Sequence, residues 1–173
     1  MIMNNGIQVI VLMGVSGCGK TIIGRLLARR LGWEYLESDK HHSPEDIRKM
    51  SSGIPLTDED RQPWLKKLNG LLKEANRSAN PVVLGCSALK SAYRRTLAED
   101  VEGLVFVHLK GDYPLIYERM QRRRHYMGAD MLRSQFEILE ETPDLIEVGI
   151  RDEPRKIIDQ IIKILFSKPD SGN

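Results

Sequence analysis

The segment Gly14-Val-Ser-Gly-Cys-Gly-Lys-Thr21 constrains the fold of this chain more than any other feature of its sequence. It matches the pattern G-x-x-x-x-G-K-[ST] and lies between an apolar segment, residues 7–13, and a segment with helical spacing, residues 20–31. Glycines let the backbone aim its N–H groups at phosphate oxygens, and the following helix turns the positive end of its dipole to the same anion. The segment therefore predicts a phosphate-binding loop in a strand–loop–helix unit.

Such a loop binds the phosphates of a nucleoside triphosphate. Lys20 is expected to reach the β- and γ-phosphates, and the Thr21 hydroxyl to ligate Mg²⁺. The chain contains no Asn-Lys-x-Asp segment, which counts against a GTPase, and the predicted third and fourth strands end without the acid usual in motor ATPases. These features favour a small-molecule kinase that uses ATP and Mg²⁺. The predicted phosphate-binding residues are Gly14, Val15, Ser16, Gly17, Cys18, Gly19, Lys20 and Thr21.

Predicted strands and helices alternate along the chain, which indicates an α/β fold with a parallel sheet. Residues 7–13 are apolar on both faces, as expected for a central strand that helices cover on both sides. With 173 residues, the chain is expected to form one domain over residues 1–166 and a frayed tail over residues 167–173. The expected strands are residues 7–13, 34–36, 81–85, 104–109 and 145–150, and the expected helices are residues 20–31, 63–76, 88–97, 113–123, 131–141 and 154–166.

Composition narrows the functional classes further. The 26 basic and 24 acidic side chains leave a net charge of +2, which gives no general reason to expect binding to nucleic acid or to an anionic membrane. The longest apolar run, near the N-terminus, is far shorter than the ~20 residues of a membrane span. Two cysteines, Cys18 and Cys86, are too few for a disulfide scaffold. We therefore expect a reduced, cytoplasmic protein.

Charged residues follow the predicted second and third strands, at the ends where open parallel sheets bind ligands. Asp39 could accept or orient the proton of an attacking hydroxyl, although an acid there also suits a turn or a helix cap. His42 follows three residues later and, taken alone, is more typical of a surface or hydrogen-bonded structural histidine than of a catalytic one. Lys90 and Arg94 are four residues apart, so one helix face carries both cations, suiting either an acidic substrate or a solvated surface.

The densest positive cluster, residues 119–125, contains Arg119, Arg123 and His125 and precedes a glycine-containing break. Arginines on a mobile lid over a triphosphate would stabilise charge on the transferring phosphoryl group and exclude water. The same residues could instead stabilise a helix C-terminus. An RNA-binding patch is a weaker alternative, because aromatic residues do not flank the arginines.

Taken together, these motifs resemble the gluconate kinases (gluconokinases), a branch of the nucleoside-monophosphate-kinase-like P-loop fold. The resemblance runs in order from about residue 9 to residue 166. The residues that carry it are Met13-Gly-Val-Ser-Gly-Cys-Gly-Lys20, Asp39 with His42, Lys49-Met50, Gly53-Ile-Pro-Leu56, Asp58-Glu-Asp-Arg61, Pro63-Trp-Leu65, Cys86-Ser-Ala-Leu-Lys90 with Tyr93-Arg94, Leu109-Lys-Gly111, Arg119, His125 and Gln135-Phe-Glu-Ile-Leu-Glu140.

The resemblance implies a three-layer fold whose five-stranded parallel sheet has the order 2-3-1-4-5, with a mobile lid over about residues 119–135. It implies ATP-dependent phosphorylation of the 6-hydroxyl of D-gluconate, in sugar-acid catabolism feeding the pentose phosphate or Entner–Doudoroff routes, and a homodimer. Lys20, Asp39, Arg119 and Arg123 would be the catalytic residues. Gluconate would be bound by Asp39, His42, Lys90, Arg94 and His125.

Several positions depart from that family pattern. Cys18 stands where serine is usual, Glu37 where aspartate is common, and Arg124 where glycine usually precedes the lid histidine. A second candidate is another small-molecule kinase of this fold, acting on shikimate or a nucleoside monophosphate. The segments Glu37-Ser-Asp39 and Gly85-Cys-Ser87 lack the Asp-x-Asp and Gly-Gly usual in shikimate kinases. A third candidate, from another class, is a nucleotide-dependent RNA-binding switch.

Overall fold

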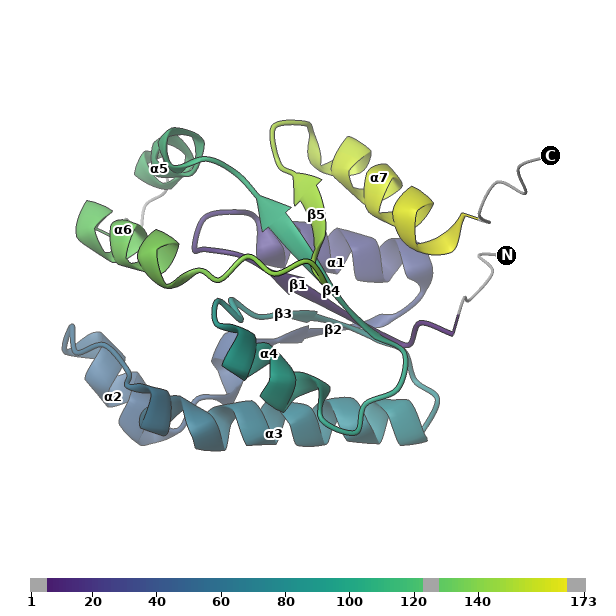
Figure 1. Cartoon of the computed structure of the whole chain (residues 1–173), viewed down its shortest axis with the longest axis horizontal. Coiled ribbons are helices and arrows are strands. Elements are labelled where there is room, and N and C mark those ends of the chain that lie inside the picture. Colours follow the sequence, from purple (N-terminus) through teal and green to yellow (C-terminus); the bar gives the residue numbers. More distant parts are fainter. Residues whose placement is uncertain (1–5, 123–127, 168–173) are drawn as a thin grey trace.

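The central strand of the fold, β1 (Val9–Met13), is buried at every position. The computed structural model describes residues 6–122 and 128–167. In these residues β1 is the middle strand of a five-stranded sheet in the order β2-β3-β1-β4-β5, and all four neighbouring pairs are parallel (Figure 1). This confirms the predicted fold class and strand order. The other strands are β2 (Glu34–Glu37), β3 (Val82–Gly85), β4 (Leu104–Lys110) and β5 (Ile146–Gly149).

Alternation along β1 divides the core between the two faces of the sheet. Ile10 and Leu12 join the cluster that contains apolar residues of α1 (Lys20–Leu31) and α7 (Pro154–Phe166). Val9, Val11 and Met13 join the cluster that contains residues of α3 (Asp58–Arg77) and α4 (Ser91–Ala98). Each fully buried aliphatic side chain stabilises the fold by roughly 1.5–3 kcal/mol. Helices therefore cover both faces, as the apolar β1 segment predicts.

Helix α3 begins earlier than predicted. The sequence suggested a start near Pro63, but the helix starts at Asp58, because Thr57 and Asp60 form a reciprocal capping box. Pro63 is the sixth residue of this helix, where its missing N–H removes only one intrahelical hydrogen bond. The earlier start brings Asp58 and Arg61 onto an ordered helix near the site described below.

The remaining elements gather at the carboxyl ends of the strands. They are the short 3₁₀ helix η1 (Ser38–His41), α2 (Pro44–Ser51), α5 (Tyr113–Gln121) and α6 (Ala129–Ile138). Figure 1 shows α2, α5 and α6 at that end of the molecule, together with the loop between β1 and α1. Ser43 and Asp46 form a capping box at the start of α2. Among the described residues no helix is long and apolar enough to span a membrane.

Candidate active site

The loop between β1 and α1 has the backbone that a phosphate-binding loop requires. Gly17 has φ +85°, and a Cβ there would lie 2.6 Å from Met120 Cγ on α5, so only glycine fits. Gly19 has φ +104° and is the N-cap of α1, so no capping side chain shields the first N–H groups of that helix. The loop thus places a helix N-terminus beside three glycines at the carboxyl end of β1, an arrangement suited to an anion.

Lys20 folds back over this loop. Its Nζ donates hydrogen bonds to the carbonyls of Gly14 at 2.9 Å and Val15 at 3.1 Å. The ammonium is therefore held at the loop, in the position from which it can meet phosphate oxygens. Cys18, the unusual loop residue, is a free cysteine and is buried.

The sequence reasoning gave no role to Gln135, which lies on α6 and contacts the loop. Its Oε1 accepts a hydrogen bond from the backbone N–H of Ser16 at 2.7 Å, and its Nε2 donates to Ser16 Oγ at 3.1 Å. One carboxamide thus holds both the backbone N–H and the hydroxyl of a loop residue 119 positions away in sequence. The conformation of the phosphate loop therefore depends on the placement of α6.

We expect Gln135→Ala to lower the affinity for a non-hydrolysable nucleoside triphosphate about tenfold, because two hydrogen bonds of ~0.5–1.5 kcal/mol each no longer order Ser16. Isothermal titration calorimetry measures this affinity. Gln121→Ala, on the exposed end of α5, is the matched control and should bind like the parent protein. An unchanged affinity in Gln135→Ala would show that the loop keeps its shape without α6.

Thr21 and Glu37 provide oxygen ligands beside the loop. The Thr21 hydroxyl donates to Glu37 Oε2 at 2.8 Å, and the Tyr35 hydroxyl donates to the same oxygen at 2.9 Å. Burial and the Glu37 carboxylate raise the pKa of Tyr35 well above its usual value, so Tyr35 remains a donor. A hydroxyl and a carboxylate suit a hard cation such as Mg²⁺. Glu37 was recognised in the sequence only as a departure, although it is the last residue of a strand that ends at the site.

Directly after β2, η1 carries Asp39, and His42 is the C-cap residue of this short helix. Asp39 is exposed there. The His42 ring stacks on Trp64 with centroids 4.3 Å apart, and Trp64 Nε1 donates to the Ser38 carbonyl at 2.9 Å. Burial lowers the pKa of His42 despite the opposing effect of nearby Asp39 and Asp46, so this imidazole is neutral at pH 7. The tryptophan therefore fixes the segment that presents Asp39.

Lys90 belongs to a charged cluster between α3 and α4. Its Nζ lies 2.8 and 3.0 Å from the two carboxylate oxygens of Asp58, and Tyr93 donates its hydroxyl hydrogen to the same carboxylate. Arg61 contacts the Tyr93 hydroxyl and the Leu56 carbonyl, at 3.4 and 2.6 Å. Hydrogen bonding to Lys90 and Tyr93 lowers the pKa of Asp58, and the partner carboxylate raises that of Lys90. Lys90 thus keeps its charge at the surface of the cluster.

Arg94 does not face this cluster, and the geometry argues against the predicted contact with a substrate carboxylate. Its side chain is buried, and the residue is 3% exposed. The guanidinium donates to three backbone carbonyls and to one hydroxyl, at distances of 2.9 to 3.2 Å. Helical spacing predicted that one helix face carries both Lys90 and Arg94, but Lys90 contacts Asp58 while the Arg94 guanidinium is buried and donates to interior acceptors. The four acceptors are the carbonyls of Ala88, Leu89 and Glu140 and the Thr142 hydroxyl.

The predicted lid is described in part. Arg119 on α5 donates from Nη2 to the Ile150 carbonyl at 2.5 Å, so it lies over the carboxyl end of β5. Arg123 and His125 lie outside the described residues. A cavity of about 520 Å³ opens beside Ile150, between the ends of β4 and β5, and is lined in part by Gly111, Phe136 and Gln160.

Most of the chain is similar to known kinases. The family model described as shikimate kinase matches residues 16–165. The chain is 41% identical to a gluconokinase from Gluconobacter oxydans, with 89% of each chain covered. It is 40% identical to the thermosensitive gluconokinase of Escherichia coli, with 87% of this chain and 83% of the relative covered. A gluconokinase structure from Sinorhizobium meliloti superimposes with a TM-score of 0.81 at 41% identity, covering 91% of this chain and 90% of that one.

Proposed function

We propose that this chain phosphorylates D-gluconate with ATP, because it belongs to the gluconokinases and the shikimate kinase family model matches most of it. The product is 6-phospho-D-gluconate, formed by in-line transfer of the γ-phosphoryl group to the 6-hydroxyl. The observation that carries the proposal is the convergence of the phosphate loop, the Thr21–Glu37 pair and the Asp39 segment at the carboxyl ends of β1 and β2, the two strands that flank β3. Identity of about 40% to gluconokinases over most of the chain supports the choice of substrate.

The phosphate side of the reaction relies on charge compensation. Loop N–H groups and the α1 N-terminus bind the phosphates, and Lys20 neutralises charge that develops on the transferring group. Thr21 and Glu37 are the residues that would hold Mg²⁺, which screens the phosphate charge when bound. Arg119, together with Arg123 of the predicted lid over about residues 119–135, would approach the same phosphates on closure.

On the acceptor side, Asp39 accepts or orients the hydroxyl proton of gluconate, because its carboxylate is exposed where β2 ends. Neutral His42 has a fixed ring orientation and can hydrogen-bond a sugar hydroxyl. Lys90 supplies a cation for the gluconate carboxylate, and His125 remains a predicted contributor from the lid. Arg94 positions the 88–94 and 140–142 segments around them, rather than binding the substrate itself.

The nucleoside part of ATP fits the cavity between the ends of β4 and β5. The cavity has a volume of about 520 Å³ and is lined in part by Ile150, whose carbonyl accepts the hydrogen bond from Arg119. Pockets of roughly 300–1,000 Å³ are typical of small-molecule and cofactor sites. This placement would put the nucleoside on the opposite side of the phosphate loop from Asp39, since β4 and β2 flank the β1–β3 pair.

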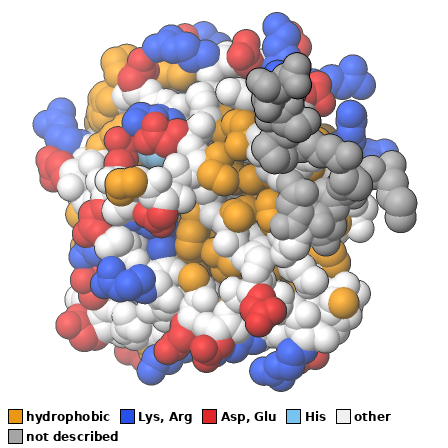
Figure 2. Space-filling model, turned by 45° about the vertical axis from the view of Figure 1, so that its right-hand side comes forward, with side chains coloured by type: hydrophobic (Ala, Val, Ile, Leu, Met, Phe, Trp, Pro, Cys, Tyr) orange, Lys and Arg blue, Asp and Glu red, His pale blue; other side chains and the backbone are white. Residues whose placement is uncertain are grey.

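Other properties follow from the same assignment. The exposed apolar residues Ile22, Leu26 and Ile164, on the neighbouring helices α1 and α7, suit contact with a second copy, which supports a homodimer. Figure 2 shows apolar side chains gathered on one face, with basic and acidic groups interspersed around them rather than one broad basic surface. We expect no nucleic-acid partner, because the net charge is only +2. A cytoplasmic, single-domain enzyme over residues 1–166, acting in sugar-acid catabolism, completes the proposal. Residues 168–173 of the predicted tail lie outside the described residues.

The test is ADP release with Mg-ATP and a panel of D-gluconate, other aldonates, shikimate and AMP. We expect turnover with gluconate, which is lost when Mg²⁺ is chelated. Turnover with shikimate instead would favour the activity named by the family model and would discard the role of Lys90. Absence of ADP release with every acceptor, combined with salt-sensitive retention of RNA on filters, would favour the RNA-binding switch.

A further inference from the structure

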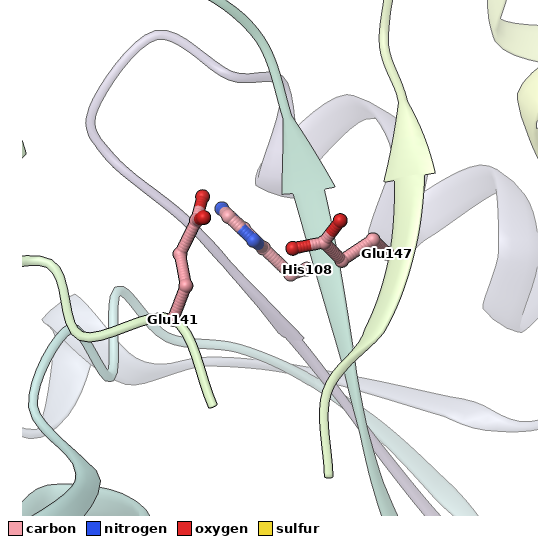
Figure 3. A group of neighbouring side chains, drawn as sticks. All are labelled: His108, Glu141 and Glu147. Carbon is pink, nitrogen blue, oxygen red and sulfur yellow. The ribbon is translucent and has the colours of Figure 1, made fainter. Parts of the chain in front are cut away.

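A second polar cluster lies at β4 and β5, whereas Glu37 of the Thr21–Glu37 pair lies on β2, at the other edge of the sheet. It consists of His108 on β4, Glu147 on β5 and Glu141 in the segment that follows α6. One ligand atom from each of the three lies within 4.8 Å of the other two. Figure 3 shows the imidazole of His108 between the two carboxylates, with Glu141 and Glu147 on opposite sides of the ring. The steps proposed above for phosphoryl transfer do not use these residues.

His108 is the unusual member of this cluster. The residue is 2% exposed, and its Nδ1 is buried with no hydrogen-bond partner among the described residues. A buried polar atom without a partner is costly and calls for an explanation. Burial lowers the pKa of His108, against the opposing effect of Glu141 and Glu147, while Lys110 and Arg94 act with burial. The ring is therefore neutral at pH 7, the form in which imidazole binds metals.

The two glutamates already bind a cation. Lys110 Nζ lies 3.1 Å from Glu141 Oε2 and 3.0 Å from Glu147 Oε1. All three of these side chains are 43–45% exposed, so they can change rotamer at little cost. A cavity of about 270 Å³ is lined by His108, Lys110 and Glu141 and provides a route for a small ion. The ammonium of Lys110 thus lies between the two carboxylates, next to the buried His108 ring, where another cation could replace it.

We propose that His108, Glu141 and Glu147 form a binding site for one divalent transition-metal ion of the zinc type, which displaces the ammonium of Lys110. Three protein ligands with one nitrogen and two carboxylate oxygens, plus water, suit tetrahedral Zn²⁺. The hard ions Mg²⁺ and Ca²⁺ prefer all-oxygen sites. The glutamates need to approach His108 by roughly 1–2 Å to reach the ~2.0–2.2 Å metal–ligand distances of zinc sites.

Such a site would have a structural consequence. The ion would join β4, β5 and the segment after α6, and α6 is the helix whose Gln135 holds the phosphate loop. Metal binding would therefore raise the melting temperature of the protein. The proposed site does not include Thr21 or Glu37, although Lys110 and Glu141 also line the cavity proposed for the nucleoside. Because zinc binding is measured on nucleotide-free protein, its absence would not count against the proposed gluconate kinase activity.

The experiment uses the full chain, stripped of metal with chelator and free of nucleotide. Isothermal titration with ZnCl₂ should show one site, and CoCl₂ should give the visible absorption of four-coordinate Co²⁺. Glu147→Gln should weaken zinc binding at least tenfold, and His108→Gln should abolish the cobalt spectrum. Lys110→Met should tighten zinc binding about tenfold, because it removes the competing cation. Glu147 and Lys110 are partly exposed, so those two variants test the site even if His108→Gln fails to fold.

Two control variants separate this site from adventitious binding. Glu34→Gln replaces an exposed carboxylate on β2, and His41→Gln replaces a histidine outside the cluster, so both should bind zinc like the parent protein. Absence of zinc binding in the parent protein would overturn the proposal. So would equal zinc affinity in Glu147→Gln and the parent protein, or weaker binding in Lys110→Met.

Discussion

Lys20→Ala is expected to lower kcat with gluconate by about 1,000-fold or more, while the protein remains folded. Removing one preorganised charge or donor from a transition-state site costs about 10²–10³ in rate, and Lys20 carries a full charge. The side chain also donates to the Gly14 and Val15 carbonyls, so its loss loosens the loop as well. Steady-state ADP release measures the rate, and thermal unfolding confirms the fold.

Lys163→Ala is the matched control, because Lys163 is exposed on α7, far along the chain from the loop. It should leave both kcat and the melting temperature unchanged. Binding of ATP to Lys20→Ala, followed separately by calorimetry, distinguishes lost catalysis from lost affinity. Turnover within tenfold of the parent protein would contradict the assignment of the phosphate loop.

Arg94→Met is expected to lower the free energy of unfolding by about 3 kcal/mol, because it leaves buried carbonyls without donors. Urea denaturation measures this loss. The methionine keeps much of the side-chain volume, so the effect reports hydrogen bonding more than cavity formation. If enough folded enzyme is obtained, KM for ATP and for gluconate should change by similar factors, since the substitution disturbs the framework that both sites share.

Arg95→Met tests the specificity of this effect, because Arg95 is the adjacent arginine and is exposed on α4. It should change the unfolding free energy by less than about 0.5 kcal/mol, as is usual for surface substitutions. If Arg94→Met instead keeps the stability of the parent protein and raises only the KM for gluconate by a large factor, Arg94 binds the gluconate carboxylate, as the sequence predicts.

Local chemistry in the sequence was sufficient for much of the fold. The bounds of α1 and α7 match their predicted residues, because apolar periodicity and end signals coincide: Gly32 takes a left-handed C-cap, and Pro154 begins its helix. The phosphate loop was predictable because glycine, lysine and threonine at fixed spacing leave few other conformations. The start of α3 differs from the prediction near Pro63, because the capping box of Thr57 begins the helix at Asp58.

The strand order had been inferred from the family resemblance rather than from residue patterns, and the paired strands confirm it. The resemblance also located Asp39, His42 and Lys90 near one another, at positions that the structure brings to one end of the sheet. Whether each contacts gluconate stays a prediction. Glu37 was visible in the sequence, but its pairing with Thr21 was not, because that contact depends on how β2 is placed beside α1.

The sequence by itself determined the phosphate loop, the alternation of strands and helices, and the chemical type of the site, because these depend on residues close together in the chain. Only the tertiary structure decided the roles of Arg94, Gln135 and His108. Arg94 is held in the interior partly by the Glu140 carbonyl, 46 residues away, and Gln135 reaches Ser16 across 119 residues. His108 meets Glu141 and Glu147 only when β4 and β5 pair. Such contacts are set by packing between distant segments, which periodicity along one segment does not encode.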